Sequence, residues 1–459
     1  MPDIHKRLAA LGLAVPEILL PRPGIDLEKW AVIACDQFTQ DRAYWERVRE
    51  CIGDSPSALN CVFPEAYLED PGRTERIAEI HRAMKSYLNE GIFAPPQQGC
   101  VYIERSTPSH QLRRGLVISI DLDSYDWQPE ARPLIRATEG TVTDRLPPRM
   151  EIRRGAPLES PHIIILIDDD EDTLLSGLAT QARHLPPVYQ SPLMLDSGSI
   201  SGWLLDREDH WTYIAEKIEA LARRAAARYQ TPQSPSSQSD PFLYAVGDGN
   251  HSLASAKAVW DEYRKAHKGE NGLADHPLRR ALVEIENIYD PGIEFEPIHR
   301  VIFNTGLYEV QALLSRLPGA RLRPVESGKT ALSALVNDPH ADKNRLGLTA
   351  GDRHIILETD APGLVTVSLQ PLLDRFIQGT ASKVGTGGPT LPSIDYIHGE
   401  KELFRLAEGA STVGILLPPV RKQGLFETVA RSGPLPRKSF SMGEACEKRF
   451  YLECRKLFW

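Results

Sequence analysis

The chain has 459 residues, 25% of them charged and 41% hydrophobic, with a formal net charge of −9. This length exceeds one typical hydrophobic core, so we expect two or three folded regions. The negative charge argues against nucleic acid or anionic membranes as partners. No apolar run approaches the roughly 20 residues of a membrane-spanning helix. The first residues also lack a signal-peptide pattern, so we expect a cytoplasmic protein.

Six cysteines are scattered along the chain, and none belongs to a Cys-x-x-Cys pair. This spacing is typical of neither a zinc site nor a disulfide framework. We therefore predict that most of them are buried, reduced thiols.

Short apolar runs alternate with helical periodicity along the chain, which predicts a mixed α/β fold. Strands are predicted at residues 30–35, 100–103, 114–122, 161–167, 242–246, 354–357, 365–369 and 413–417. Helices are predicted at 42–50, 73–91, 211–228 and 307–317, and a further helix follows the glycine turn at 247–249. The acidic run 168–172 after one strand is read as a solvated turn, because it lacks the spacing of oxygen ligands for a metal.

Changes in composition and pattern along the chain indicate where one folded region ends and the next begins. The Pro/Ser-rich segment 231–240 cannot bury much surface and is predicted to be a flexible loop. Beyond residue 304 the α/β pattern starts again, which indicates a separate C-terminal lobe. We therefore predict an N-terminal α/β region at 1–130, a central region at 131–304 and a C-terminal lobe at 305–459.

The most informative segment is the turn Gly247-Asp248-Gly249-Asn250-His251-Ser252, between a predicted strand and a predicted helix. Glycines let the backbone approach a ligand closely, and the unpaired N–H groups of a helix start bind anions. Asp248 and His251 would place titratable groups beside such a phosphate pocket. The alternative is a plain strand–turn–helix connection in which Asp248 or Asn250 is the N-cap.

A second polar segment, 135–149, places Arg136, Arg145 and Arg149 around Glu139 and Thr141. Guanidinium groups bind carboxylates or phosphates, and a carboxylate among them can accept a proton from a hydroxyl. The alternative is an exposed loop held by salt bridges.

Other candidates lie further apart in the sequence. Asp36 follows a predicted strand, where ligands of α/β sheets gather, although it can equally cap the next element. His398, with Lys438 and Ser439, could bring a ligand contact from the C-terminal lobe. Structural packing is the alternative for these three residues.

Together these segments resemble the bacterial and archaeal family known as domain of unknown function 1015, over nearly the whole chain. The resemblance is carried by Ala34-Cys35-Asp36, by the segment from Ile135 to Arg149, by Gly247 to Ser252, by Pro297-Ile298-His299-Arg300, by Ile394 to His398 and by Pro436 to Ser439. Other branches have Asp-Gly-His-His-Arg at the glycine turn. Here that arginine is missing, so phosphate contacts would fall on the backbone and on Lys257.

The glycine turn is also similar to the nucleotide motif of the ParB/sulfiredoxin superfamily, which implies a ParB/sulfiredoxin-like central region. That superfamily includes CTP-binding segregation factors, sulfiredoxins and free-serine kinases. A sulfiredoxin needs a cysteine in the motif, and none lies between Cys100 and Cys446. A segregation factor needs a basic helix-turn-helix domain, which the net charge of −9 fits poorly.

The resemblance therefore favours a nucleotide-dependent kinase of free serine or a similar hydroxyl metabolite, with ADP or ATP as donor. In this hypothesis Glu139 is the general base, Asp248 binds Mg²⁺ or orients the hydroxyl, and His251 contacts the transferred phosphate. The arginines 136 and 145 would hold a substrate carboxylate or donor phosphate. The alternatives are a non-catalytic nucleotide-binding regulator and a hydrolase or lyase of a phosphorylated metabolite, and a homo-oligomer is left open.

Overall fold

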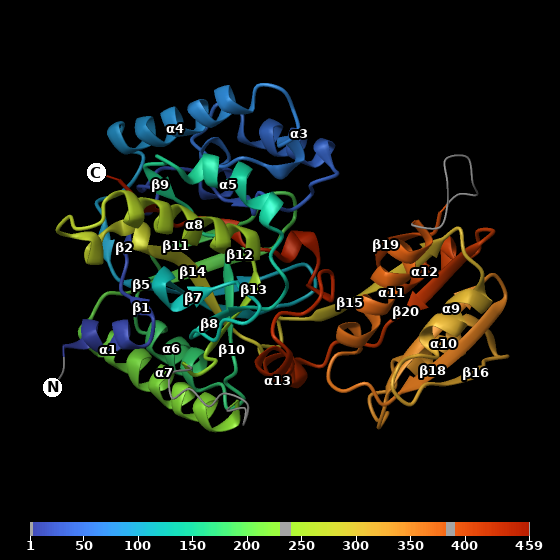
Figure 1. The fold of residues 1–459 in the computed structure, drawn as a ribbon. Helices are drawn as coiled ribbons and strands as arrows, with labels where there is room; N and C mark the ends of the chain where they lie inside the picture. Colours follow the sequence, from blue (N-terminus) through green and yellow to red (C-terminus); the bar gives the residue numbers. More distant parts are fainter. Residues whose placement is uncertain (1–2, 230–239, 382–390, 459) are drawn as a thin grey trace. The chain divides into compact units, whose positions relative to one another are not determined.

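The computed structural model describes residues 3–229, 240–381 and 391–458 (Figure 1). The chain forms two compact units: unit 1 comprises residues 1–294 and 443–459, and unit 2 comprises residues 295–442. Both combine helices with β-sheets, which confirms the predicted mixed α/β class. The predicted loop 231–240 lies, except for Asp240, outside the described residues.

This division differs from the three predicted regions. Strands from both sides of residue 130 belong to one sheet, so the first two predicted regions share a core. The last residues of the chain also return to unit 1 instead of ending the C-terminal lobe. A change in composition is a local property of the chain. Strand pairing between distant segments determines which residues fold into the same unit.

Unit 1 is built on a ten-stranded sheet in the order β11-β12-β5-β6-β14-β10-β13-β8-β7, with β1 paired to β6. Its strands are β1 (Leu13–Ala14), β5 (Cys100–Ser106), β6 (Arg113–Asp121), β7 (Tyr125–Asp126), β8 (Ile135–Ala137), β10 (Ile164–Ile167), β11 (Tyr189–Pro192), β12 (Ser199–Leu205), β13 (Tyr244–Asp248) and β14 (Arg280–Asn287). Its helices are α1 (Ile4–Ala10), α2 (Leu27–Trp30), α3 (Arg42–Ile52), α4 (Arg73–Asn89), α5 (Leu146–Arg153), α6 (Thr173–Ala182), α7 (Glu208–Arg228) and α8 (Asn250–Ala266).

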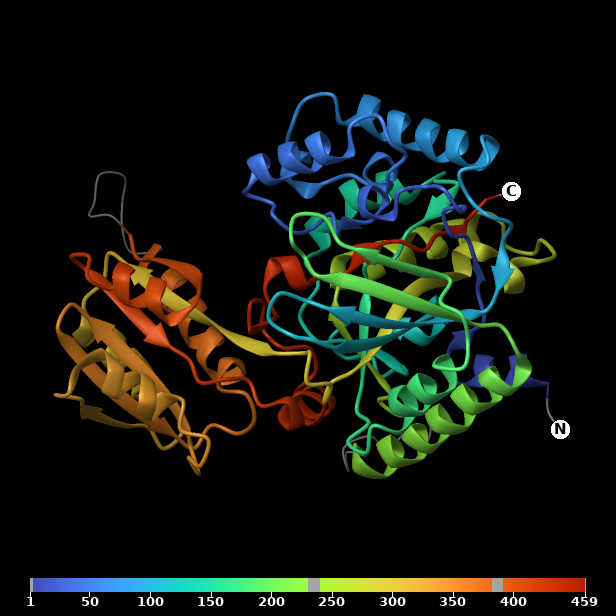
Figure 2. The ribbon, with the colours of Figure 1, turned by 180° about the vertical axis from the view of Figure 1, so that it is seen from behind.

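The sheet is covered on both faces. Successive strand residues point to opposite sides, so Leu116 and Ile118 of β6 join one hydrophobic core while Val117 joins the other. Side chains of α1, α6, α7 and α8 complete the first core, and those of α2, α3 and α4 complete the second. Helix α1 lies along α7 (Figure 2), where Arg7 binds Glu219 through two hydrogen bonds of 2.9 and 3.0 Å.

The C-terminal segment 443–458 is threaded into unit 1. Strand β22 (Phe450–Tyr451) pairs with β3 (Val32–Ile33), and β23 (Arg455–Lys456) pairs with β9 (Leu158–Glu159). A further two-stranded sheet joins β2 (Glu17–Ile18) to β4 (Gln97–Gln98). Arg449 is buried between Glu284, at 2.7 Å, and Glu453, at 2.5 Å. These contacts fix the last residues against the first strands of the chain.

Unit 2 contains a seven-stranded sheet in the order β16-β18-β17-β20-β15-β19, with β21 paired to β15. Its strands are β15 (Phe295–Phe303), β16 (Arg321–Pro324), β17 (Asn344–Ala350), β18 (Arg353–Thr359), β19 (Ser393–His398), β20 (Thr412–Leu416) and β21 (Phe440–Met442). Its helices are α9 (Leu307–Leu314), α10 (Gly328–Val336), α11 (Val365–Ala381), α12 (Glu400–Leu406) and α13 (Lys422–Ser432).

One predicted strand is wrong. Residues 365–369 form the first turns of α11 instead of a strand. Their alternating Val and Leu residues suggested a period of two, but Val365, Leu369 and Leu373 are buried four residues apart in the core of unit 2. Tertiary burial at helical spacing therefore outweighs the local β propensity. Among the helices that the structure describes, none is long and apolar enough to cross a bilayer.

Candidate active site

The glycine turn forms an open helix start. Gly249, the N-cap of α8, has φ +79°, and an added Cβ would meet Ile163 atoms at 3.0 and 3.1 Å. Both the left-handed conformation and the close approach therefore require glycine. Within the described chain no side chain caps this end, and the first helical hydrogen bond runs from Leu253 N–H to the Gly249 carbonyl at 3.0 Å. The amides of Asn250 and Ser252 are thus in position to bind an anion, and neither Asp248 nor Asn250 is the N-cap.

The loop after β8 reaches the same helix start. Strands β8 and β13 are parallel neighbours, so their carboxyl ends lie at the same edge of the sheet. The Thr138 hydroxyl donates to the Val246 carbonyl at 2.7 Å, and the Val142 amide donates to Nε2 of His251 at 3.3 Å. The predicted residues Glu139 and Thr141 lie on this loop, each half-buried.

Histidine 162, just before β10, links three segments at this point. Its Nε2 lies 2.9 Å from the Ser252 hydroxyl and 3.8 Å from a carboxylate oxygen of Asp36. Its Nδ1 lies 2.8 Å from the Tyr451 hydroxyl. Pairing of β3 with β22 brings Asp36 and Tyr451 to the same place, although they are distant in sequence.

A lysine completes the cluster. The Lys448 ammonium lies 3.3 Å from one carboxylate oxygen of Asp248, and its side chain is only 9% exposed. The other Asp248 oxygen accepts the Gly249 amide at 3.0 Å. A largely buried cation is therefore fixed beside the helix start, where it can bind a phosphate oxygen.

A buried ion pair lies beside Asp36. Arg149 binds the Glu65 carboxylate and also donates to the Arg145 carbonyl at 2.7 Å. Burial, with a further contribution from the Asp36 charge, raises the pKa of Glu65, and Arg149 opposes this rise. The Glu65 amide in turn donates to the Cys35 carbonyl at 2.7 Å. These contacts hold the segment that carries Asp36.

Arg136, Lys257 and Arg145 are the remaining predicted site residues of unit 1. The Arg136 guanidinium donates to the carbonyls of Pro133 and Asp240, at 3.1 and 3.2 Å, and lies over the Phe242 ring. Burial, together with nearby Arg132, lowers the pKa of Arg136 to about 10. Arg136 therefore holds the loop ends together, and its expected substrate contact stays a prediction.

Lys257 lies two turns into α8 and binds Asp261 at 3.0 Å and Asp123 at 3.6 Å. The i, i+4 spacing of a helix explains the first pair. Lys257 therefore belongs to an ion-pair cluster two turns from the helix start, and its expected phosphate contact stays a prediction. Arg145 is exposed in the short turn before α5.

His398, Lys438 and Ser439 all lie in unit 2. His398 is exposed on β19, Lys438 is exposed, and the buried Ser439 hydroxyl donates to the Pro436 carbonyl at 2.6 Å. The motif residue Arg300 is buried in the same unit, where its guanidinium binds Gln370 at 3.2 Å. The buried His299 accepts the Leu417 amide at 3.1 Å. Ser439, Arg300 and His299 therefore have structural contacts in unit 2.

The helix start also has an unmatched acceptor. Among the described residues, the buried Oδ1 atom of Asn250 has no hydrogen-bond partner. Buried polar atoms are usually paired with protein, water or a ligand. Together with the open amides, this atom indicates a place for a polar ligand.

Sequence reasoning missed His162, Lys448 and Tyr451. His162 precedes the strongest predicted strand, and its position at a strand end was the available signal. Lys448 and Tyr451 lie in a C-terminal segment without a recognisable motif. Only the pairing of β22 with β3 brings this segment to the site.

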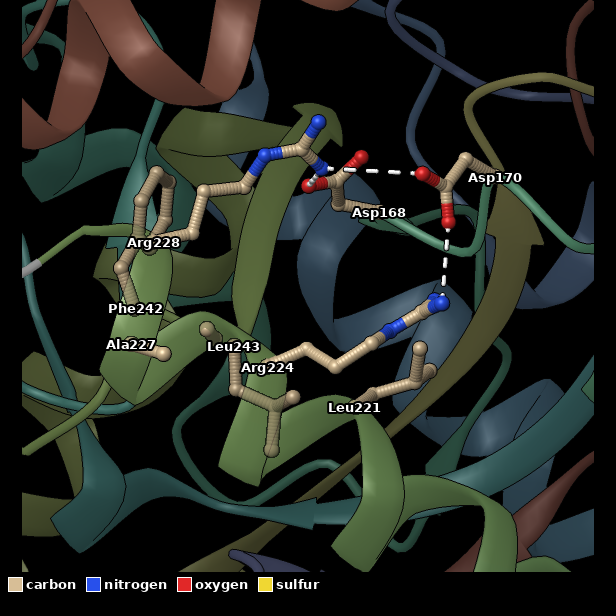
Figure 3. Close-up of a pocket in the computed structure, with 9 residues that line it drawn as sticks. Asp168, Asp170, Leu221, Arg224, Ala227, Arg228, Phe242 and Leu243 are labelled. Carbon is tan, nitrogen blue, oxygen red and sulfur yellow. Dashed lines mark hydrogen bonds and ion pairs between the residues drawn. The ribbon is translucent and has the colours of Figure 1, made fainter.

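A cavity of about 380 Å³ lies elsewhere in unit 1, at the other end of β10 (Figure 3). Its apolar wall includes Phe242 and Leu243, and its rim carries charged side chains. Arg228 binds Asp168 at 2.9 Å and Arg224 binds Asp170 at 3.0 Å. Two carboxylates of the acidic run are thus paired with arginines of α7. No group of three or more His, Cys, Asp or Glu suited to a metal occurs in the described ranges.

Comparisons with known proteins add the following. The profile of the family described as "Protein of unknown function (DUF1015)" matches residues 19–376. No curated protein matches the chain. A conserved hypothetical protein from Pyrococcus furiosus is 12% identical, with a TM-score of 0.34, over 74% of this chain and 94% of that chain.

Two further solved structures are complexes of free serine kinase. The complex with AMP is 11% identical, with a TM-score of 0.36, over 74% of this chain and 92% of that chain. A mutant in complex with ADP is 13% identical, with a TM-score of 0.36, over 77% of this chain and 95% of that chain. At TM-scores this low, the likeness decides neither activity nor ligand for the present chain.

Proposed function

The chain belongs to the domain of unknown function 1015 family, and from the cluster at the start of α8 we propose that it is a phosphotransferase. It would transfer a phosphoryl group from a nucleoside di- or triphosphate to the hydroxyl of a small metabolite. The observation that carries the proposal is the combination of open amides, Asp36, Asp248, His162 and Lys448 at one helix start.

Phosphoryl transfer requires mainly positioning and charge stabilisation. The amides of Asn250 and Ser252 and the positive end of the α8 dipole supply fixed donors for a terminal phosphate. Lys448 adds a positive charge that Asp248 holds in place at 3.3 Å. His251, held by the Val142 amide, borders the same donors.

A carboxylate must accept the proton of the attacking hydroxyl. Glu139, on the loop that reaches His251, stays the proposed general base, and Asp36 is the second carboxylate of the cluster. The exposed Arg145 is the proposed contact for an acceptor carboxylate. Arg136 and Lys257 have no part in this proposal because structural contacts hold them.

Mg²⁺ is proposed to enter with the nucleotide. The ion is usually held by one or two carboxylates together with substrate phosphates. Asp248 suits this role, because its carboxylate is 19% exposed and faces the helix start. The ion would neutralise phosphate charge when bound.

The test is ³¹P NMR of the purified chain with Mg²⁺ and L-serine, supplied in turn with ADP, ATP and CTP. A phosphomonoester resonance that depends on both serine and nucleotide supports the kinase and identifies the donor. Asp248→Asn should abolish it. The same change at Asp261, which lies on α8 and pairs with Lys257, should leave the resonance unchanged.

Other outcomes count against the proposal. Nucleotide line broadening without transfer to serine or to a panel of small hydroxyl compounds would indicate a nucleotide-binding regulator. Release of phosphate to water from phosphomonoesters would indicate a hydrolase using the same anion site. No nucleotide effect at all would contradict a nucleotide site at α8.

A further inference from the structure

We propose that Ser252 is an activated nucleophile, that His162 is its general base, and that the phosphoryl group passes through a phosphoserine at position 252. This inference rests on the proposed phosphotransfer, and it assigns a covalent step to the same site. It depends on three contacts of His162 and on the place of Ser252 in α8.

The first observation is the nucleophile–base contact. The Ser252 hydroxyl lies 2.9 Å from Nε2 of His162. A hydroxyl within hydrogen-bond reach of a base, with a third group orienting that base, is the usual geometry of an activated nucleophile. Ser252 is half-buried and His162 is 8% exposed, so the contact is shielded from bulk water.

The second observation concerns which nitrogen of His162 carries the proton. The Tyr451 oxygen accepts the Cys35 amide at 3.2 Å. A tyrosine oxygen has two lone pairs, and in the proposed arrangement the second one accepts Nδ1–H of His162, 2.8 Å away. Nε2 is then unprotonated and accepts the Ser252 proton. Tyr451 is therefore a positioning residue.

The third observation is the charge around this contact. An oxygen of Asp36 lies 3.8 Å from Nε2 of His162, so its carboxylate stabilises the imidazolium that forms. Ser252 is in the first turn of α8, whose amides and dipole favour a phosphate. The nearby Lys448 adds positive charge.

The chemistry balances in two steps. First, Ser252 Oγ forms a bond to the terminal phosphorus of the nucleotide, the bond to the leaving nucleotide oxygen breaks, and Nε2 of His162 takes the serine proton. Second, the acceptor hydroxyl attacks the phosphoserine and gives its proton to the proposed base Glu139. His162 returns its proton to Ser252 Oγ as that bond breaks.

The experiment begins with the wild-type chain and ATP or ADP labelled in the terminal phosphate, without an acceptor. We expect one phosphoryl group per chain, located on Ser252 by peptide mass spectrometry, and its loss when L-serine or another hydroxyl acceptor is added. The labelling rate should rise with pH, because only an unprotonated imidazole can take the serine proton.

Variants separate chemistry from structure. His162→Gln should slow labelling by roughly 10²–10⁴-fold and remove its pH dependence. Tyr451→Phe should retain labelling with a shifted pH profile. Ser255→Ala is the matched control, because that hydroxyl on the same helix donates to the His251 carbonyl at 2.7 Å. It should leave labelling unchanged.

The outcomes distinguish this inference from the proposed function. A phosphoester product formed equally fast by wild type and Ser252→Ala, without label, overturns the phosphoserine and retains the kinase. Labelled Ser252 that only water discharges retains the phosphoserine and overturns the kinase. Neither label nor product with any nucleotide overturns both.

Discussion

The two ends of β10 place different chemistry at opposite edges of one sheet. At the amino end, where Ile164 pairs with Asp248, the α8 start presents uncapped amides and the unmatched Oδ1 of Asn250. At the carboxyl end lies a cavity of about 380 Å³, and arginines of α7 pair with the Asp168 and Asp170 carboxylates at its rim. Unsatisfied polar groups, and not cavity volume, are therefore our reason for proposing the site at the start of α8.

The two ends also differ in their dependence on the C-terminal segment. Residues 443–458 supply Lys448 and Tyr451 to the amino end of β10. The described lining of the cavity comes instead from the turn after β10, from α7 and from the residues just before β13. Changes in the C-terminal segment should therefore alter the α8 site and leave the cavity unchanged.

The largest effect is expected for Arg449→Met, because it leaves buried Glu284 and Glu453 without their common cation. Removing one partner of a buried ion pair typically costs about 3–5 kcal/mol of unfolding free energy. Urea denaturation measures this loss. Arg224→Gln, at the half-exposed cavity rim, should cost less than about 1 kcal/mol. Equal losses would contradict the difference between the two ends.

Lys448→Met should lower the phosphotransfer rate by roughly 10²–10³-fold, since one fixed donor to the developing charge is lost. Steady-state kinetics with the donor found by NMR measures this. Lys257→Met, which breaks the pair with Asp261, should retain a rate near that of wild type. The reverse result would restore Lys257 as the phosphate contact.

Gly249→Ala should destabilise the chain by about 2 kcal/mol, because a left-handed backbone and close contact with Ile163 combine. Gly155→Ala is the matched control: its φ is +70°, but nothing lies within 4 Å of the added Cβ. It should cost about 1 kcal/mol. If thermal unfolding gives the same loss for both, the contact with Ile163 has no energetic role.

The smallest effect concerns pH. Burial opposes ionisation of Glu447, but hydrogen bonds from Ser109, the Glu444 amide, Thr107 and His110 outweigh it and lower the pKa to about 2. The unfolded carboxyl titrates near 4.5. The stability from the ionised group is therefore complete above 4.5 and is lost as the pH falls toward 2.

Glu447→Gln should accordingly cost about 1.5 kcal/mol at neutral pH, and this difference from wild type should shrink as the pH falls from 4.5 to 2. Denaturant unfolding at several pH values measures it. The control is Glu171→Gln, at an exposed residue of the acidic run after β10. Its difference from wild type should not change in this way over the same pH range. A constant difference for Glu447→Gln across the range would contradict the lowered pKa.

Much of the local structure could be predicted from the sequence. The helices near residues 42, 73 and 211 and the strands around 114 and 164 are found within a few residues, because periodic burial leaves a direct pattern. The 365–369 strand failed because a short apolar run fits either period. The bounds of the two compact units could not be read from the sequence, because strand pairing between distant segments has no local signal.

By itself the sequence determined the mixed α/β class, the family and the glycine turn, since backbone requirements such as a positive φ at Gly249 are local. The tertiary structure alone decided which side chains meet there. In the folded chain Arg136 binds backbone carbonyls and Lys257 forms an ion pair. His162, Lys448 and Tyr451, which the sequence did not indicate, lie beside the α8 start. Charge pairing depends on three-dimensional neighbours, and these are set by packing of segments hundreds of residues apart.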